Sequence, residues 1–337
     1  MKIKQFLQAF WQEQKGAIAA VAAVAAVPFL GFAAMALDVG YLMTVKAELQ
    51  NAADAGALSG ARGLIPYAGG NPPQPNWSNA ETEANQKVTG NKAAGTALSS
   101  AQLEPGYWNL LTKEMKSTGI TPATGEVPAI RVTVAKEQGQ NGGPLQLFFA
   151  GLINNSPKDV AAQAVGLISG PANLPANSKV FPVAIAEELT KQHWNDSPPF
   201  NFKICSDYHY NDEMAGQWTS LLQDFNNVPA IRNLMDNGNP TPLKIGDNIY
   251  IQPGTKTSIY KEVIPKIGQI VIMPVVRTDF ETHAFTPLLA FAPFKITNVV
   301  GGSGKYIEGY FVKDYVIPKG NPGGPYYGGF TPPRLSN

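Results

Sequence analysis

One segment near the N-terminus, residues 16–63, dominates the hydrophobic pattern of the chain. Its first part, Gly16 to Leu37, reads GAIAAVAAVAAVPFLGFAAMAL and contains no charged side chain. As a helix that rises about 1.5 Å per residue, this run would reach roughly 33 Å, which is enough to cross the apolar core of a bilayer. Gly16, Pro28 and Leu37 therefore mark the beginning, the interior and the end of a predicted membrane anchor.

The second part of the segment is amphipathic. Apolar and small residues recur every three or four positions and fall on one helical face: Leu42, Val45, Leu49, Ala52, Ala53, Gly56 and Gly60. Charged residues occupy other positions around the helix, and Gly63 is a suitable C-cap. The pattern predicts one long helix whose first half lies in lipid and whose second half stands in water as a stalk.

Small residues at a spacing of four predict close packing along this stalk. Ala52, Gly56 and Gly60 form one such row, and rows of this kind allow two helices to approach closely. Glycine is a poor helix former, so its presence on the face favours packing over simple helix propensity. An isolated amphipathic helix in water must bury its apolar face. We therefore expect this face, together with Leu49, to be an assembly surface covered by a neighbouring subunit.

The charged residues before the apolar run predict its orientation. Lys2, Lys4 and Lys15 precede the run, and positive charge stays on the cytoplasmic side of a membrane. The N-terminus is therefore expected inside the cell, with everything after Leu37 exported. A cleaved signal peptide is the alternative, since Ala34-Met35-Ala36 resembles a cleavage site. The length of the run and the unbroken helical pattern beyond it favour a retained anchor.

The remaining sequence predicts an α+β chain in four further parts after the anchor and stalk (1–63). A proline-rich linker spans 64–77, a small α+β module spans 78–170, a β-rich exported domain spans 171–317 and a flexible tail spans 318–337. In the module, Ser78 and Glu81 form a capping box for a helix expected to end near Ser100. Strands are predicted at 106–111, 129–136 and 159–167, and a helix at 145–153. Predictions in the domain are strands at 180–186, 200–205, 244–252, 270–276, 288–300 and 305–316, and helices at 213–225 and 228–237.

Composition excludes some functions. The 26 Lys and Arg residues nearly balance the 25 Asp and Glu residues, giving a net charge of +1. This balance argues against nucleic acid as a partner, because phosphate binding needs a basic excess. The single cysteine, Cys205, cannot form an internal disulfide, so an exported fold must depend on its hydrophobic core.

Two short strings could carry chemistry. On a strand, Cys205, Asp207 and His209 would share a face and could bind zinc or form a Cys–His nucleophile pair. The alternative is a strand that ends in a polar loop, and it is favoured because no partner motif accompanies the string. Gly301 to Lys305, GGSGK, lacks the spacing of a phosphate loop and predicts a hairpin turn. No catalytic residue, metal or cofactor is predicted.

The N-terminal segment resembles a known family. It combines Lys15-Gly16 before the apolar run, Pro28 within it, Asp38-Val39-Gly40 at its end, and the string LQNAADA at 49–55. With these features, residues 11–63 are similar to the N-terminal segment of TadG-like proteins of the tight-adherence (Tad, Flp) pilus assembly system. The resemblance implies an inner-membrane protein that acts by packing with other pilus assembly components.

The chain departs from that family in two ways. A prepilin peptidase cuts some relatives after a glycine and favours glutamate five residues later, but the fifth residue after Gly16 is Val21. Some relatives also carry a metal site with the string D-x-S-x-S, which is missing here. Neither processing nor a metal site is therefore transferred to this chain.

Three functions follow from the sequence. The first is a membrane-anchored assembly component of a Tad-type pilus, with other pilus components, the lipid bilayer and further copies of the chain as partners. The second is an exported surface adhesin or ligand-binding protein. The third, which the sequence supports least, is an exported hydrolase that uses Cys205 and His209.

Overall fold

A computed structural model provides the structure of the chain. It describes residues 2–65, 74–123, 125–150, 157–193, 196, 199–205, 208–210, 213–225, 227–254 and 256–336, with the backbone alone for 2–20, 209–210 and 213. These residues form two compact units. Unit 1 comprises Met1–Ala53, Lys87–Gln102 and Thr133–Gln163, and unit 2 comprises Asp54–Gln86, Leu103–Val132 and Ala164–Asn337. The predicted linker lies mostly outside the described residues.

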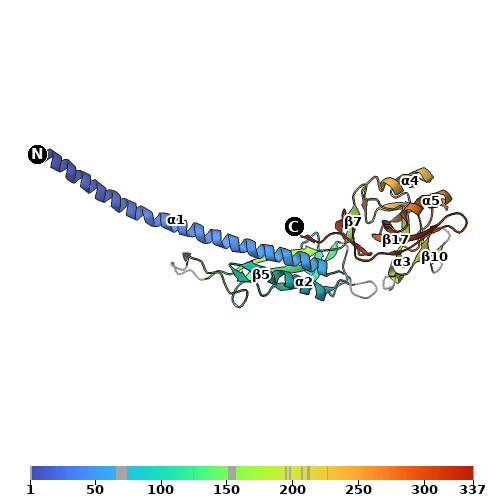
Figure 1. Cartoon of the computed structure of the whole chain (residues 1–337), viewed down its shortest axis with the longest axis horizontal. Coiled ribbons are helices and arrows are strands. Elements are labelled where there is room, and N and C mark those ends of the chain that lie inside the picture. Colours follow the sequence, from blue (N-terminus) through green and yellow to red (C-terminus); the bar gives the residue numbers. More distant parts are fainter. Residues whose placement is uncertain are drawn as a thin grey trace. The chain divides into compact units, whose positions relative to one another are not determined.

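Helix α1 runs without interruption from Lys2 to Gly63 (Figure 1). Its many alanines favour a helix, and the sequence continues through Pro28 without a break. The helix ends as predicted at Gly63, whose carbonyl accepts a hydrogen bond of 2.8 Å from the side-chain amide of Asn79. The prediction of one long helix is confirmed, and the helix also includes the residues before Gly16.

Helix α2, Trp77–Thr89, differs from its prediction at both ends. Asn76 provides the N-terminal cap, because its Oδ1 accepts a hydrogen bond of 3.2 Å from the backbone N–H of Asn79. The capping box at Ser78 and Glu81 is therefore wrong by two residues. The helix also stops well before Ser100, since the chain turns into the hairpin of β1, Lys92–Ala93, and β2, Thr96–Ala97.

A five-stranded sheet of order β22-β6-β5-β3-β4 combines four strands between residues 102 and 167 with one strand near the C-terminus. Its strands are β3 (Gln102–Asn109), β4 (Met115–Lys116), β5 (Glu126–Lys136), β6 (Val160–Leu167) and β22 (Arg334–Leu335). The predictions for 129–136 and 159–167 are confirmed, whereas the strand expected at 106–111 begins and ends earlier. The helix expected at 145–153 is wrong over its described part, where Leu145 pairs with Lys158 in an isolated bridge and a turn follows.

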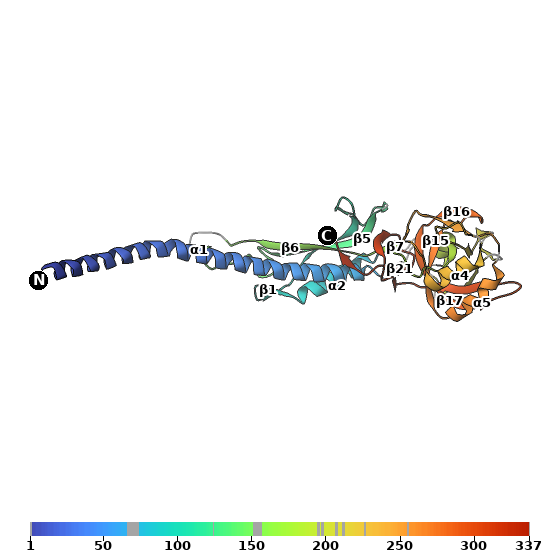
Figure 2. The ribbon, with the colours of Figure 1, turned by 90° about the horizontal axis from the view of Figure 1, so that it is seen from above.

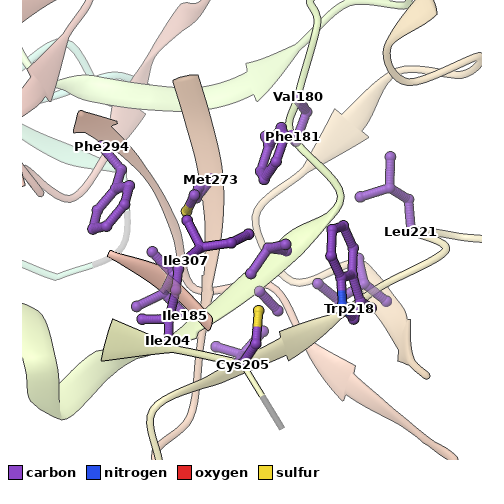
Figure 3. Packing of buried hydrophobic residues seen from close by; sticks show 14 of the residues in the cluster. Val180, Phe181, Ile185, Ile204, Cys205, Trp218, Leu221, Met273, Phe294 and Ile307 are labelled. Atoms are coloured by element: carbon purple, nitrogen blue, oxygen red, sulfur yellow. The ribbon is translucent and has the colours of Figure 1, made fainter. Parts of the chain in front are cut away.

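The C-terminal part of unit 2 is built around a six-stranded sheet of order β12-β8-β15-β17-β18-β9. Its strands are β8 (Val183–Ala186), β9 (Phe202–Ile204), β12 (Gly216–Trp218), β15 (Ile270–Val276), β17 (Ala290–Val300) and β18 (Tyr306–Phe311). Side chains such as Trp218, Phe294 and Met273 fill its hydrophobic core (Figure 3). The predicted β-rich character of the C-terminal region is confirmed.

Two helices were predicted in this domain, and only one exists. Helix α4, Val228–Asn237, matches its prediction, is capped by Asn227 and ends before Gly238. The helix expected at 213–225 is wrong. That segment contains β11 (Glu213–Met214) and β12, because Gly216, Gln217 and Trp218 pair with β8. Tertiary pairing here overrides a local pattern that both states could satisfy.

Short elements complete the described chain. They are β7 (Gly170–Leu174), β10 (His209–Tyr210), β13 (Leu243–Lys244), β14 (Asn248–Ile251), β16 (Ala284–Pro287), β19 (Tyr315–Val316), β20 (Asn321–Gly324), β21 (Gly329–Phe330), α3 (Glu187–Gln192), α5 (Tyr260–Val263) and the 3-10 turns η2 (Thr257–Ile259) and η3 (Ile264–Lys266). The predicted strand 244–252 is divided by a turn at Ile245-Gly246.

The C-terminal residues form strands and are no flexible tail. β20 pairs with β7, β21 pairs with β19, and β22 pairs with β6. Thr331 is fully buried and Phe330 nearly so. The prediction of a flexible tail at 318–337 is therefore wrong, because this glycine- and proline-rich segment pairs with strands elsewhere in unit 2.

Candidate functional site

The surface of α1 between Val21 and Leu37 is apolar and exposed. The large side chains there are 60–75% exposed, namely Val21, Val24, Val27, Phe29, Leu30, Phe32, Met35 and Leu37. By length and composition, this is a helix that could cross a membrane, with a mean hydropathy of 1.9 over its most apolar stretch. A helix that presents large apolar side chains all around its axis is suited to lipid, and water would solvate it poorly.

Asp38 ends this apolar surface and is itself buried. Its carboxylate accepts hydrogen bonds from three consecutive backbone N–H groups: Phe148 (2.8 Å), Phe149 (3.0 Å) and Ala150 (2.7 Å). Together they satisfy a charge that would otherwise be costly to bury. Sequence reasoning used Asp38 only as a mark of resemblance. The signal was available, since a lone carboxylate directly after a long apolar run needs hydrogen-bond donors.

Two further polar contacts hold unit 1 together along α1. The backbone N–H of Ala94 donates to Glu48 at 2.7 Å, and Gln50 Nε2 donates to the carbonyl of Gln163 at 3.1 Å. Figure 2 shows β6 lying beside α1 along this stretch. The helix after the apolar run is therefore partly covered by the chain's own residues.

The predicted assembly surface is covered in the same way. Leu49 and Ala52 are fully buried, and Gly56 and Gly60 are also buried. A Cβ atom on Gly60 would lie 2.8 Å from Ile130 Cγ2 and 2.9 Å from Ala84 Cβ. The small residues serve close packing as expected, but their cover is the chain itself. Their interpretation as a surface for a neighbouring subunit is corrected by this burial.

A second glycine shows how closely β6 packs against the end of α1 within unit 2. At Gly166 on β6, a Cβ atom would lie 2.0 Å from the carbonyl oxygen of Ala57. No side chain fits there without displacing backbone, so glycine is required on the strand as well as on the helix. The end of α1 is thus an internal element of unit 2.

The Cys205 string does not form the predicted cluster. β9 ends at Ile204, and Cys205 follows it with φ 99° and a fully buried side chain in the hydrophobic core (Figure 3). His209 lies on another strand, β10, and Asp207 is outside the described residues. The prediction that the three side chains share one strand face is therefore wrong. Within the described part of the chain, no group of three or more His, Cys, Asp and Glu residues is arranged to hold a metal ion.

The remaining polar strings have structural roles. Residues 301–305 connect β17 to β18, which pair antiparallel with Val300 opposite Tyr306, so the predicted hairpin turn is confirmed. His193 Nδ1 lies 2.7 Å from Asp196 Oδ2, and its ring stacks on Phe200.

One ion pair in unit 2 contains a carboxyl group with a lowered pKa. Glu126, at the start of β5, is buried and hydrogen-bonded to Lys116 on β4. Its other carboxylate oxygen accepts a hydrogen bond of 2.9 Å from the backbone N–H of Ala123. The Lys116 hydrogen bond, followed by that of Ala123, holds the pKa of Glu126 below its usual value.

Comparison with known proteins identifies one part of the chain. Residues 16–63 match the model of the family Tad, described as putative Flp pilus-assembly TadE/G-like, and the match ends where α1 ends. Comparisons with curated proteins and with solved structures gave no match. The resemblance predicted from the N-terminal residues is confirmed over this segment: α1 contains a TadE/G-like segment of the Flp pilus-assembly type.

Proposed function

We propose that the chain is a structural component of a Tad-type pilus assembly machinery, anchored in the bacterial inner membrane by the first half of α1. The observation that carries this proposal is the exposed apolar surface from Val21 to Leu37, which lies inside the TadE/G-like segment. The N-terminus would lie in the cytoplasm, because Lys2, Lys4 and Lys15 precede the apolar run. Everything after Leu37 would be exported.

The work of the protein would be contact with other pilus components, without catalysis. The burial of Cys205 in a hydrophobic core supports this view, since an inert structural thiol is typically buried and a reactive one accessible. The glycine row of α1 is covered by the chain itself. Contacts with partners or with further copies of the chain would therefore be made by other surfaces of the two units.

Labelling of single cysteines in intact cells tests the topology. Cys205 is first replaced by alanine, and a cysteine is then placed at Leu111, whose side chain is 89% exposed in unit 2. The matched control places the cysteine at Gln8, before the apolar run. A maleimide that cannot cross the inner membrane is applied to cells with a permeabilised outer membrane. We expect labelling at position 111 and none at position 8 until the cells are lysed.

Three results would contradict the proposal. Labelling at position 8 with protection at position 111 would reverse the topology. Recovery of a chain that begins after Leu37 in the soluble periplasmic fraction would mean a cleaved signal peptide. Deletion of the gene should also abolish pilus-dependent adherence, and adherence at the level of the parent strain would refute the assembly role.

A further inference from the structure

The segment held by Asp38 presents two aromatic side chains to solvent. Phe148 is 66% exposed and Phe149 is 38% exposed, although their backbone N–H groups are both fixed by the Asp38 carboxylate. The described residues around them, 145–150, read LQLFFA and carry no charge. Two adjacent exposed phenylalanines in an uncharged segment form a small apolar patch, and the Asp38 hydrogen bonds hold its backbone in place.

The position of this segment along α1 relates the patch to the predicted anchor. Asp38 is the residue directly after the apolar run, and its neighbours Leu37 and Val39 are themselves 60% and 50% exposed. The Phe148 ring also lies 5.1 Å from the ring of Tyr41, one helical turn further along α1. The two phenylalanines are therefore fixed at the level where the predicted lipid-facing surface ends.

We propose that Phe148 and Phe149 form a second membrane contact, inserted into the headgroup region of the bilayer beside the anchor. This inference rests on the proposed anchoring by α1. Aromatic side chains are favoured at the membrane–water interface, and the neutral segment 145–150 brings no charge into it. Asp38 acts as a positioning residue, because its three hydrogen bonds hold the backbone of this segment at the end of the apolar run.

The consequence is mechanical. A single helix that emerges from a bilayer leaves the protein above it free to tilt and rotate about the helix axis. A second contact, attached to the helix at Asp38, would set the height and rotation of unit 1 on the membrane. A partner protein could bind the same aromatic pair, but an exposed apolar pair at the end of an anchor meets lipid first.

Spin labels at defined positions test the inference in the full chain with Cys205 replaced by alanine. A nitroxide is attached to Phe148→Cys, and the protein is reconstituted into vesicles of phosphatidylethanolamine and phosphatidylglycerol. The control label is at Ala97→Cys, an exposed position of the hairpin that Glu48 holds. The helix rises about 15 Å between Asp38 and Glu48, so this hairpin should lie in water. A third label at Leu30→Cys reports on the anchor itself.

The ratio of collisions with oxygen to collisions with a water-soluble nickel complex measures the depth of each label. We expect the ratio to be several-fold higher at position 148 than at position 97, and highest at position 30. A further label is attached at the exposed position 146, in place of Gln146. We expect its ratio to be high in the parent sequence and to fall when Phe148 and Phe149 are both replaced by serine, a change that leaves the Asp38 hydrogen bonds in place.

The outcomes separate the two proposals. A deep label at position 30 with equal ratios at 148 and 97 would overturn the second contact and leave the anchor intact. A shallow label at position 30 would overturn the anchor and the second contact with it. If the label at 148 becomes protected only when other pilus components are added to the vesicles, the occupant is a protein and the lipid contact is refuted.

Discussion

Replacing Gly60 by alanine should have two opposite effects on stability, a gain in helix propensity and a loss from overpacking. The structure allows each to be estimated separately. Gly60 lies in the last turn of α1, where the helix packs against α2 and β5 within unit 2. A methyl group there would lie 2.8 Å from Ile130 Cγ2, 2.9 Å from Ala84 Cβ and 3.0 Å from the carbonyl oxygen of Ala80. All three distances are shorter than an ordinary van der Waals contact, and two involve atoms close to backbone.

The expected change in the free energy of unfolding is the difference between these two effects. Alanine in place of glycine stabilises a helix by about 1 kcal/mol. Overpacking of a filled interior costs about 1–3 kcal/mol, and the three close contacts place Gly60→Ala in the upper half of that range. We therefore expect a net loss of about 1 kcal/mol or more in the free energy of unfolding of unit 2. For a unit of this size, such a loss lowers Tm by about 2–4 °C.

Gly40→Ala provides the matched control in the same helix. Gly40 is exposed, and no atom lies within 4 Å of the position its Cβ would take. This variant gains helix propensity without a clash, so it should be neutral or stabilising by up to about 1 kcal/mol. The assay is thermal unfolding of the full chain in detergent micelles, followed by tryptophan fluorescence.

A double-mutant cycle sharpens the test. Ala84→Gly removes the methyl group that Gly60→Ala would meet, so the pair moves one methyl group from α2 to α1. The double variant should be more stable than the sum of the two single effects by about 0.5 kcal/mol or more. The reasoning is refuted if Gly60→Ala stabilises the protein as Gly40→Ala does, or if the two changes are simply additive.

Three further outcomes are expected. Cys205 should resist maleimide in the folded protein and react only after denaturation, so rapid labelling of native protein would contradict its burial. Cys205→Ala should lower the free energy of unfolding by about 1 kcal/mol through lost packing and leave adherence intact. The pKa of Glu126 is lowered in the folded state, so its contribution to stability is present above the pKa of this group in the unfolded chain and is lost as pH falls through the lower folded value. Glu126→Gln should therefore reduce Tm at pH 7 and match the parent protein in strong acid. An equal deficit in Tm at every pH would argue for a packing defect. Truncation after Gly328 removes β21 and β22, including the buried Phe330 and Thr331. The truncated protein should be cleaved by protease within unit 2 under conditions in which the full chain resists. Equal resistance would show that these strands are dispensable.

The sequence was sufficient for the elements whose pattern is long or local. The α1 helix ends at Gly63 as expected, and the alternating segment at 129–136 is part of β5. The bounds predicted for α4 also agree with the structure, where Asn227 caps the first turn and the helix ends before Gly238, because caps and breakers act on the nearest backbone groups. The apolar run from Gly16 to Leu37 likewise predicted a membrane-spanning surface from its length and lack of charge, and its large side chains from Val21 to Leu37 are exposed.

Only the tertiary structure decided what covers each surface. The row through Gly56 and Gly60 predicted close packing, but spacing along a helix does not reveal which segment supplies the opposite face. The strands near the C-terminus were missed for the same reason, since glycine and proline suppress the local pattern and β22 exists only by pairing with β6. The contact between Asp38 and the backbone of residues 148–150 joins groups about 110 positions apart in the chain. The sequence alone determines that this protein has a long helix with an apolar first half. Folding determines which buried groups meet along it, because packing and hydrogen bonding depend on proximity in space.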